Sequence, residues 1–435
     1  MSTQLAYEVA APTESAETAA VPKIAFFGIF GIQNLGNECT LQSILQNVRR
    51  YLPSAALYAI SFNPADTAER HGLPSFPVSQ QHFGSVAPHR GLSKYFAKLL
   101  RLVRRIPDEW NDWRMAVRTL RGTDMMIMTG TGMLTDYMTR ASGFPYHVFR
   151  WTAAARLAGC RVKYVGVGVG PIYGRGSRFL ITRALSLAGY RSFRDQNSKS
   201  RIRNNGFNSD HDPVFPDLVF SLAPEMFPKK AAVAGPVRRV GLGVMDHRDI
   251  HMWSDAEHAA QYSSYLNKMC EFVCWLVEHQ YEVRILQGDA KHDAGTRAEL
   301  RDRLEARGIR YERDGIVDEG SATVDDLIRQ IAQTDLVVSP RFHNLLLGLM
   351  MNIPAISISY DPKNDCLLEG VGLGEFRQSL PELDVQKLIE QFTQMVARSD
   401  ALKPHIARKT DEYRDALDVQ YEMILGEYKR RSRNR

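Results

Sequence analysis

The sequence predicts an α/β fold of two successive doubly wound domains, each with a parallel sheet covered by helices on both faces. Three observations lead to this prediction. Short apolar runs alternate along the chain with longer amphipathic stretches. The runs are continuous and not broken at every second position, which is typical of parallel strands that are buried on both faces. The alternation stops at residues 226–238, a linker rich in Pro and Ala, and then starts again.

The first predicted domain spans residues 23–225. Its apolar runs predict strands at 23–30, 56–62, 124–130, 161–170, 190–195 and 216–222. The stretches between them predict helices at 37–50, 143–158, 178–189 and 196–205. Residues 1–22, rich in Ala, Thr and Glu, are typical of a disordered leader.

The second predicted domain spans residues 239–380. Its apolar runs predict strands at 240–245, 281–289, 309–313, 335–340 and 354–361. The intervening stretches predict helices at 256–279, 294–307, 323–333 and 342–351. Polar helices and a basic tail are expected over residues 381–435. Ligands of such folds bind beyond the carboxyl ends of the strands, so we expect a cleft between the two sheets.

The net charge of +6 is concentrated locally. The last eight residues, YKRRSRNR, contain five basic side chains, so the high overall charge does not by itself indicate nucleic-acid binding. Residues 89–121 are predicted as an inserted helix, and one of its faces carries Arg90, Lys94, Lys98, Arg101 and Arg105. That face would suit an anionic membrane surface, and a solvated face above a packed one explains it equally well.

The composition argues against several classes of protein. No run reaches the roughly 18 apolar residues that would span a bilayer. The N-terminus lacks the basic and apolar regions of a secretory signal. The five cysteines are few and scattered, which favours reduced thiols over a disulfide framework. We therefore expect a cytoplasmic protein.

Familiar cofactor and metal motifs are not found. The glycines of GVGVGP (166–171) lack G-x-G-x-x-G spacing, and neither a phosphate loop nor G-x-S-x-G occurs. Cys270 and Cys274 have no second cysteine pair, so core packing explains them better than a metal does. His247 and His251, with two nearby aspartates, are better explained by a polar cleft loop.

The candidate site residues follow predicted strands. In DLVVSPRFHNLLLG, a strand leads directly into Arg341, His343 and Asn344 at the first turn of a helix. Free backbone N–H groups, the positive end of the helix dipole and a planar guanidinium all favour an anion there. His343 could donate a proton near neutral pH. The alternative is a buried helix cap with a hydrogen-bonded histidine.

Other candidates lie at equivalent places in the fold. Arg194 follows a strand, although a simple ion pair with Asp195 would also explain it. Tyr360 and Lys363 follow another strand, and Lys363 adds a further cation.

A third group opens the first predicted helix. Asn34, Gly36 and Asn37 lie in GIQNLGNE, where glycine would let a ligand approach the backbone. A plain tight turn explains these residues equally well.

Several segments, taken in order, resemble the polysaccharide pyruvyl transferase family. They are GIQNLGNE (31–38), TGTGMLTDY (129–137), VGVGVGPI (165–172), RSFRDQNSKSRIRNNG (191–206), FPDLVFSL (215–222) and SPRFHNLLLGLMMNIPAISISYDPK (339–363). The resemblance covers roughly residues 23–375, with a poor match at 64–121.

The resemblance implies a cytoplasmic, GT-B-like enzyme of exopolysaccharide biosynthesis. Its donor would be phosphoenolpyruvate and its acceptor a saccharide, free or linked to a membrane lipid. The pyruvyl group would pass to two hydroxyls of one sugar as a cyclic ketal, with no metal or cofactor and no nucleic-acid partner.

Residue by residue, the family's Arg and Arg-x-His positions fall on Arg194, Arg341 and His343. These are the predicted catalytic residues. The predicted substrate-binding residues are Lys363, Asn34, Gly36, Asn37, Asn344 and Tyr360. The family usually has Asp at the position of Asn37, so acceptor choice could differ here. The alternatives are a nucleotide-sugar glycosyltransferase and a non-catalytic relative that binds anions.

Overall fold

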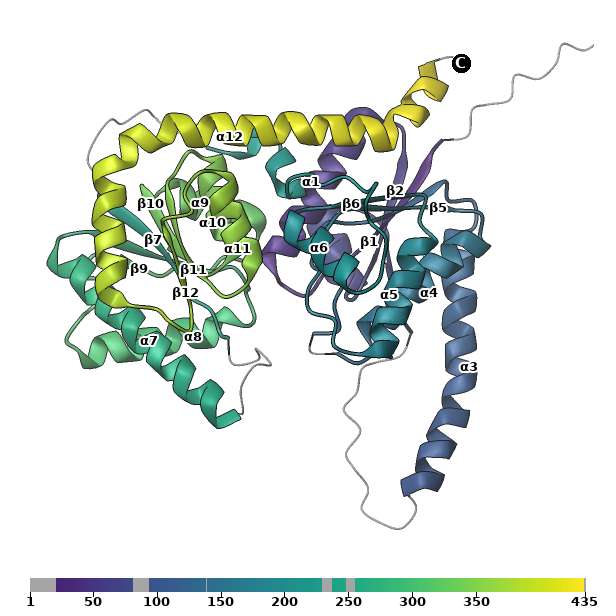
Figure 1. The fold of residues 1–435 in the computed structure, drawn as a ribbon, viewed down its shortest axis with the longest axis horizontal. Helices are drawn as coiled ribbons and strands as arrows, with labels where there is room; N and C mark the ends of the chain where they lie inside the picture. The colour runs from purple at the N-terminus through teal and green to yellow at the C-terminus, as the bar shows by residue number, and fades with distance from the viewer. Residues whose placement is uncertain (1–20, 81–93, 138, 229–236, 248–254, 434–435) are drawn as a thin grey trace, which may run out of the picture.

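A computed structural model describes residues 21–80, 94–137, 139–228, 237–247 and 255–433, with side chains of 94–106, 255–256 and 430–433 outside that description. The predicted fold class is confirmed, because two parallel six-stranded sheets lie side by side, each flanked by helices (Figure 1).

The N-terminal sheet has the strand order β3-β2-β1-β4-β5-β6. Its strands are β1 (Lys23–Phe27), β2 (Ala56–Ser61), β3 (Ser75–Pro77), β4 (Met125–Met128), β5 (Arg161–Val167) and β6 (Tyr190–Phe193). The order reverses between β1 and β4, which is where an open α/β sheet forms a crevice at its carboxyl edge.

The C-terminal sheet repeats this order as β12-β11-β10-β7-β8-β9. Its strands are β7 (Arg239–Gly243), β8 (Glu282–Leu286), β9 (Ile316–Val317), β10 (Leu336–Ser339), β11 (Ala355–Ser359) and β12 (Arg377–Ser379). Every residue of β10 and β11 is buried, as the continuous apolar runs predicted.

Helices connect the strands of both sheets. They are α1 (Leu35–Tyr51), α2 (Pro64–His71), α3 (Lys94–Leu120), α4 (Phe144–Leu157), α5 (Arg175–Ser186), α6 (Gln196–Asn204), α7 (Asp255–Glu278), α8 (Asp293–Ala306), α9 (Val324–Ala332), α10 (Phe342–Met350), α11 (Pro362–Gly370) and α12 (Val385–Arg433), with 3₁₀ helices η1 (Leu218–Ser221) and η2 (Pro224–Met226). Within the residues described, no helix has both the length and the apolar composition to cross a membrane.

Two predicted strands are wrong. Residues 216–222 form η1 instead, because the Asp217 carboxylate accepts a hydrogen bond from the Val219 backbone N–H and starts a helical turn. Residues 309–313 form a turn, in which the Asp314 carboxylate accepts a hydrogen bond from the Arg310 backbone N–H, and the strand follows at β9.

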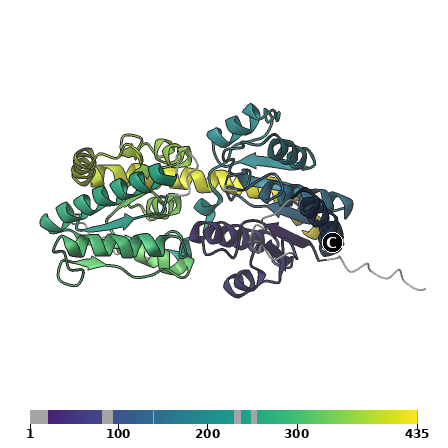
Figure 2. The same ribbon diagram turned by 90° about the horizontal axis from the view of Figure 1, so that it is seen from below.

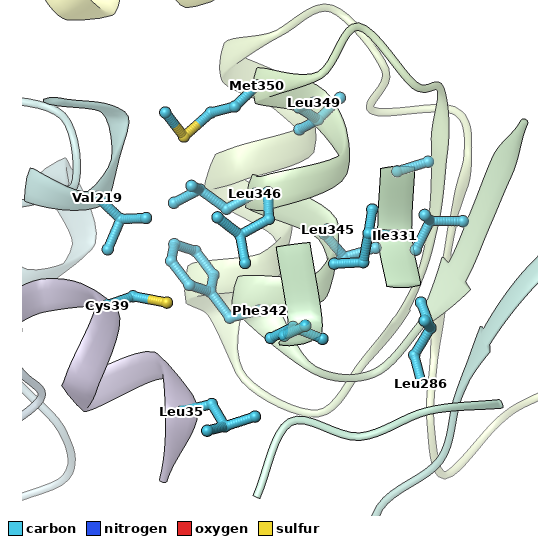
Figure 3. Packing of buried hydrophobic residues seen from close by; sticks show 14 of the residues in the cluster. Leu35, Cys39, Val219, Leu286, Ile331, Phe342, Leu345, Leu346, Leu349 and Met350 are labelled. Atoms are coloured by element: carbon cyan, nitrogen blue, oxygen red, sulfur yellow. The ribbon is translucent and has the colours of Figure 1, made fainter. Parts of the chain in front are cut away.

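The two halves share an apolar interface. Leu35 and Cys39 of α1, together with Val219 of η1, face Phe342 and Leu346 of α10 (Figure 3). All five are buried, so the contact resembles the inside of a domain. This interface places the start of α1 directly against the start of α10.

Helix α12 ties the halves together from outside. It is one 49-residue helix where the sequence predicted more than one, with Pro404 inside it. Figures 1 and 2 show it running from the C-terminal sheet back across the N-terminal half. There, Glu427 pairs with Arg161, and the Ile424 carbonyl accepts a hydrogen bond from Lys163 Nζ.

Candidate functional site

The start of α10 carries the Arg-x-His pair. Strand β10 ends at Ser339, whose Oγ accepts hydrogen bonds from the Arg341 backbone N–H (3.0 Å) and from Asn344 Nδ2 (3.3 Å). These contacts fix the turn between strand and helix. Asn344 is fully buried, and its Nδ2 helps to hold this turn through Ser339.

Arg341 is held by a carboxylate. Its guanidinium forms an ion pair with the fully buried Asp293, with Nε 3.1 Å from Oδ2. Burial acts to lower the pKa of Arg341, but Asp293 outweighs it and raises that pKa. Asp293 also accepts the backbone N–H groups of Gly288 and Asp289, so it fixes the loop after β8 and the arginine together. Arg341 is therefore a positioned cation whose charge is already shared.

His343 meets the first turn of α1 across the interface between the two halves. A Cβ atom built on Gly36 would lie only 2.0 Å from His343 Nδ1, so a residue with a side chain cannot stand at Gly36 without movement. On its other side the imidazole lies edge to face with Phe342, at 5.1 Å between ring centroids. Its Nε2 is buried and has no hydrogen-bond partner in the part of the chain that the structure describes.

The electrostatic surroundings of His343 disfavour the imidazolium. Burial, then Arg194, then Lys363 lower the pKa of His343 to about 3. The ring is therefore neutral at pH 7 in the free protein. The two cations act on it from opposite halves, since Arg194 follows β6 and Lys363 belongs to α11.

Arg194 projects from the N-terminal sheet toward α10. Its Nε donates to Asp195 Oδ2 (3.3 Å), its Nη1 lies 3.7 Å from Asp217 Oδ2, and its guanidinium stacks over the Phe342 ring at 5.4 Å. Burial acts to lower the pKa of Arg194, but the two aspartates outweigh it and raise that pKa. A Cβ on Gly168 would come within 2.7 Å of the guanidinium, so this glycine makes room for it.

Tyr360 follows β11, and Lys363 lies in the first turn of α11. The Lys363 ammonium lies 4.8 Å from the centre of the Tyr360 ring, and the Lys363 backbone N–H donates to Asp361, the N-cap of α11. Asp361 thus caps the helix. Arg194 and Lys363 both interact with its carboxylate electrostatically.

The start of α1 is fastened to the C-terminal half. Asn34 caps α1 through Asn37, and its Nδ2 donates to Asp289 Oδ2 at 3.1 Å. The Leu35 backbone N–H donates to the Gly288 carbonyl at 3.1 Å. Asn34 therefore joins the two halves, in a turn that also holds Gly36 against His343.

A cavity of about 570 Å³ adjoins these residues. It lies among the start of α6, the segment before η1, η1 itself, the start of α10, α11 and the middle of α12. Arg194 and Lys363 line it, together with Asp217 and several aromatic side chains, whereas Arg341 and His343 are not among its lining residues. The sequence analysis did not identify Asp217 or Asp293 as site residues. The only local signal was the Pro-Asp pair at Asp217, which precedes an apolar stretch.

Other motifs from the sequence lie outside this site. Cys270 is buried and Cys274 is partly exposed, both as free thiols. His247 is buried, with its ring 5.0 Å from that of Tyr265, whereas His251 falls outside the described residues. The side chains of the basic face at 90–105 also fall outside them.

Solved structures with the same architecture include two enzymes. The UDP-GlcNAc 2-epimerase of Neisseria meningitidis bound to UDP-GlcNAc has a TM-score of 0.54 at 10% identity, over 93% of this chain and 100% of that one. The UDP-GlcNAc 2-epimerase of Methanocaldococcus jannaschii has 0.54 at 11%, over 86% and 92%. At such identities the likeness concerns the fold alone. Among curated protein sequences, none matches significantly.

One sequence family also matches this chain. The model described as polysaccharide pyruvyl transferase matches residues 34–362. The matched range begins at Asn34 and includes Arg194, Arg341 and His343.

Proposed function

Because the chain belongs to the polysaccharide pyruvyl transferase family, we propose that it moves the pyruvyl group of phosphoenolpyruvate onto two hydroxyls of one sugar. The product is a cyclic ketal on a polysaccharide or its lipid-linked precursor. The observation that carries this proposal is the environment of His343, whose unpartnered Nε2 lies under the influence of Arg194 and Lys363 where the two halves meet.

Phosphoenolpyruvate brings a phosphate and a carboxylate on a small skeleton, so its site requires several fixed cations. Arg194 comes from one half and Lys363 from the other. The N-terminus of α10, with Arg341 as its N-cap, adds backbone N–H groups and a helix dipole. An anion bound between these groups would contact residues of both halves.

Anion binding also supplies the protonation state that the chemistry requires. Arg194 and Lys363 lower the pKa of His343 in the free protein, and a bound anion would offset their charge. The pKa of His343 would then rise, and the imidazolium would donate its proton to the methylene carbon of the substrate. A sugar hydroxyl attacks the adjacent carbon, phosphate leaves with the electrons of its C–O bond, and the second hydroxyl closes the ketal.

The experiment follows phosphate release and ketal formation by mass spectrometry. Purified protein is incubated with phosphoenolpyruvate and with saccharides, nucleotide sugars and lipid-linked glycans as candidate acceptors. Phosphate release with a matching gain of the pyruvyl mass supports the proposal. Release of nucleotide from a nucleotide sugar without phosphate release would instead favour a glycosyltransferase. If neither phosphate nor nucleotide is released, both activities are contradicted.

We also propose contact with an anionic membrane face at the cytoplasmic side, through the basic residues at 90–105 and the YKRRSRNR tail. Each basic side chain near such a surface contributes about 1 kcal/mol. Vesicles containing an anionic lipid should co-sediment the protein at low salt and release it at high salt. Co-sedimentation that salt does not change would contradict the proposal.

A further inference from the structure

We propose that the cavity beside Arg194 holds the acceptor sugar and that Asp217 is the base that takes the proton from its attacking hydroxyl. This inference rests on the proposed function. It concerns the aromatic walls of the cavity and one buried carboxylate oxygen that accepts no hydrogen bond from the described residues.

The cavity is too large for the donor alone. Its volume of about 570 Å³ is within the range of about 300–1,000 Å³ typical of small-molecule sites, and a three-carbon acid with one phosphate fills only part of it. The cationic side chains Arg194 and Lys363 lie on its lining, so an anion held by them would leave the rest of the space open.

The remaining walls have the composition expected for a sugar site. Phe215 and Tyr413 offer aromatic surface, on which the C–H face of a pyranose ring can pack. Asp217 and Glu369 offer carboxylates that can accept hydrogen bonds from hydroxyls. Mostly apolar walls with a few placed polar groups are typical of small-ligand pockets.

The two carboxylate oxygens of Asp217 differ in their hydrogen bonding. Its Oδ1 accepts from the Val219 backbone N–H at 3.0 Å, which fixes the carboxylate at the start of η1. Its Oδ2 is buried and accepts no hydrogen bond from the described residues, although it forms a 3.7 Å ion pair with Arg194, and the residue is only 5% exposed. In neighbouring Asp195, by contrast, both oxygens accept hydrogen bonds, from Ser198 and from Arg194.

The surroundings of Asp217 suit a proton acceptor near the donor. Burial raises the pKa of Asp217, and Arg194 and the Val219 backbone N–H offset only part of this rise. A carboxylate with a raised pKa is a better base near neutral pH. Arg194 Nη1 lies 3.7 Å from Asp217 Oδ2, so phosphoenolpyruvate bound to Arg194 would lie beside this carboxylate.

The proton balance of the reaction closes with these two residues. His343 gives a proton to the methylene carbon while Asp217 takes one from the attacking hydroxyl, and a C–O bond forms as the C=C bond is lost. The departing phosphate then takes its electron pair and the proton from Asp217. The second hydroxyl bonds to the same carbon and gives its proton to His343, which restores both residues.

The first test replaces Asp217 by Asn, which retains an oxygen that can cap η1. We expect kcat to fall by roughly 10²- to 10⁴-fold, the contribution typical of a positioned base. Binding of phosphoenolpyruvate, measured by calorimetry, should stay the same or tighten because a negative charge beside Arg194 is lost. Asp212→Asn is the control, since Asp212 pairs with Arg191 in the same half but does not line the cavity. A wild-type kcat for D217N would overturn the role of Asp217.

The second test uses the native thiol of Cys366, which lines the cavity and is partly exposed. Methyl glycosides of galactose, glucose and mannose should each slow its alkylation by iodoacetamide if they occupy the cavity, with the strongest effect for the sugar that is pyruvylated. Cys274, partly exposed and outside the cavity lining, is the internal control and should react at an unchanged rate.

The outcomes separate the two proposals. If no glycoside protects Cys366, the sugar cavity is overturned even if the enzyme makes ketals. Protection of Cys366 without phosphate release from any acceptor would support the sugar cavity and contradict pyruvyl transfer, and the role of Asp217 as base would then be overturned as well.

Discussion

Replacement of Gly36 by Ala tests whether the placement of His343 depends on the docking of α1. The new Cβ would lie 2.0 Å from Nδ1 of the imidazole, 2.5 Å from Cε1 and 2.7 Å from Cγ. Ordinary contacts begin at 3.4 Å, so the closest approach falls short by about 1.4 Å. Either the imidazole or the start of α1 must move by more than 1 Å.

Both movements carry a cost that can be measured. Displacement of a reacting group by about 1 Å lowers turnover roughly 10²-fold. Movement of α1 instead would break the hydrogen bond from the Leu35 N–H to the Gly288 carbonyl. Overpacking costs about 1–3 kcal/mol, and the better helix propensity of Ala than Gly returns at most about 1 kcal/mol. We therefore expect G36A to lose kcat by about 10²-fold with a modest loss of stability.

The assay combines phosphate release with thermal unfolding, and the chain offers a matched control. Gly295 also lies in the first turn of a helix, α8, and nothing lies within 4 Å of a Cβ built on it. G295A should keep wild-type kcat and gain slightly in Tm. If G36A matches G295A in both measurements, the close contact between Gly36 and His343 does not position the imidazole, and the reasoning is refuted.

Three further substitutions probe charge in the site. His343→Asn should abolish turnover and should also flatten the pH dependence of the free energy of unfolding. The wild type loses stability below about pH 6.5, because the unfolded histidine binds a proton there, whereas the folded histidine, with a pKa of about 3, does not. The slope difference is at most about 1.4 kcal/mol per pH unit in denaturant titrations. Arg194→Lys should weaken phosphoenolpyruvate binding about 10- to 100-fold by calorimetry, because lysine lacks the planar fork. Asp293→Asn should cost about 3–5 kcal/mol in denaturant unfolding, because it breaks the buried pair with Arg341.

Matched controls exist for each of these substitutions. Arg191→Lys alters an arginine on β6, the strand that Arg194 follows. Arg191 is paired with Asp212, and its replacement should leave phosphoenolpyruvate binding unchanged. Asp418→Asn removes a half-exposed pair with Arg50 and should cost less than about 1 kcal/mol. His147, whose pKa burial lowers to about 4, contributes equally to the acid slope of wild type and H343N, so only the difference between them reports on His343.

Much of the fold could be predicted because buried parallel strands leave a strong signal in a single sequence. Apart from Lys23 and Ser339, the residues of β1, β4 and β10 are apolar, and their burial in the structure is almost complete. The strands that were missed are β3, β9 and β12. They have only two or three residues each and lie at sheet edges, where few buried positions are available to give a sequence its apolar pattern. At 216–222 the apolar residues are buried as their pattern indicates, but the Asp217 side chain caps a 3₁₀ helix there and no strand forms.

The cations of the site could be predicted from their places after strands, but their partners could not. Arg341 was expected to be free to bind an anion, whereas Asp293, which comes from another loop, holds it. The contact between Gly36 and His343 depends on how the two halves dock, and no local pattern encodes that. Asp217 was overlooked because a residue expected inside a strand is not a candidate base.

The paired charges explain how the proposed donor site can contain a buried arginine. Arg194 shares its charge with Asp195 and Asp217, so it is not an uncompensated buried cation. The same burial pushes His343 toward its neutral form and Asp217 toward its neutral form, one pKa falling and the other rising. With these shifts the His343 imidazolium is a stronger acid, and the Asp217 carboxylate a stronger base, than the same groups are in water. A reaction that takes a proton from an oxygen and adds one to a carbon would gain from both changes.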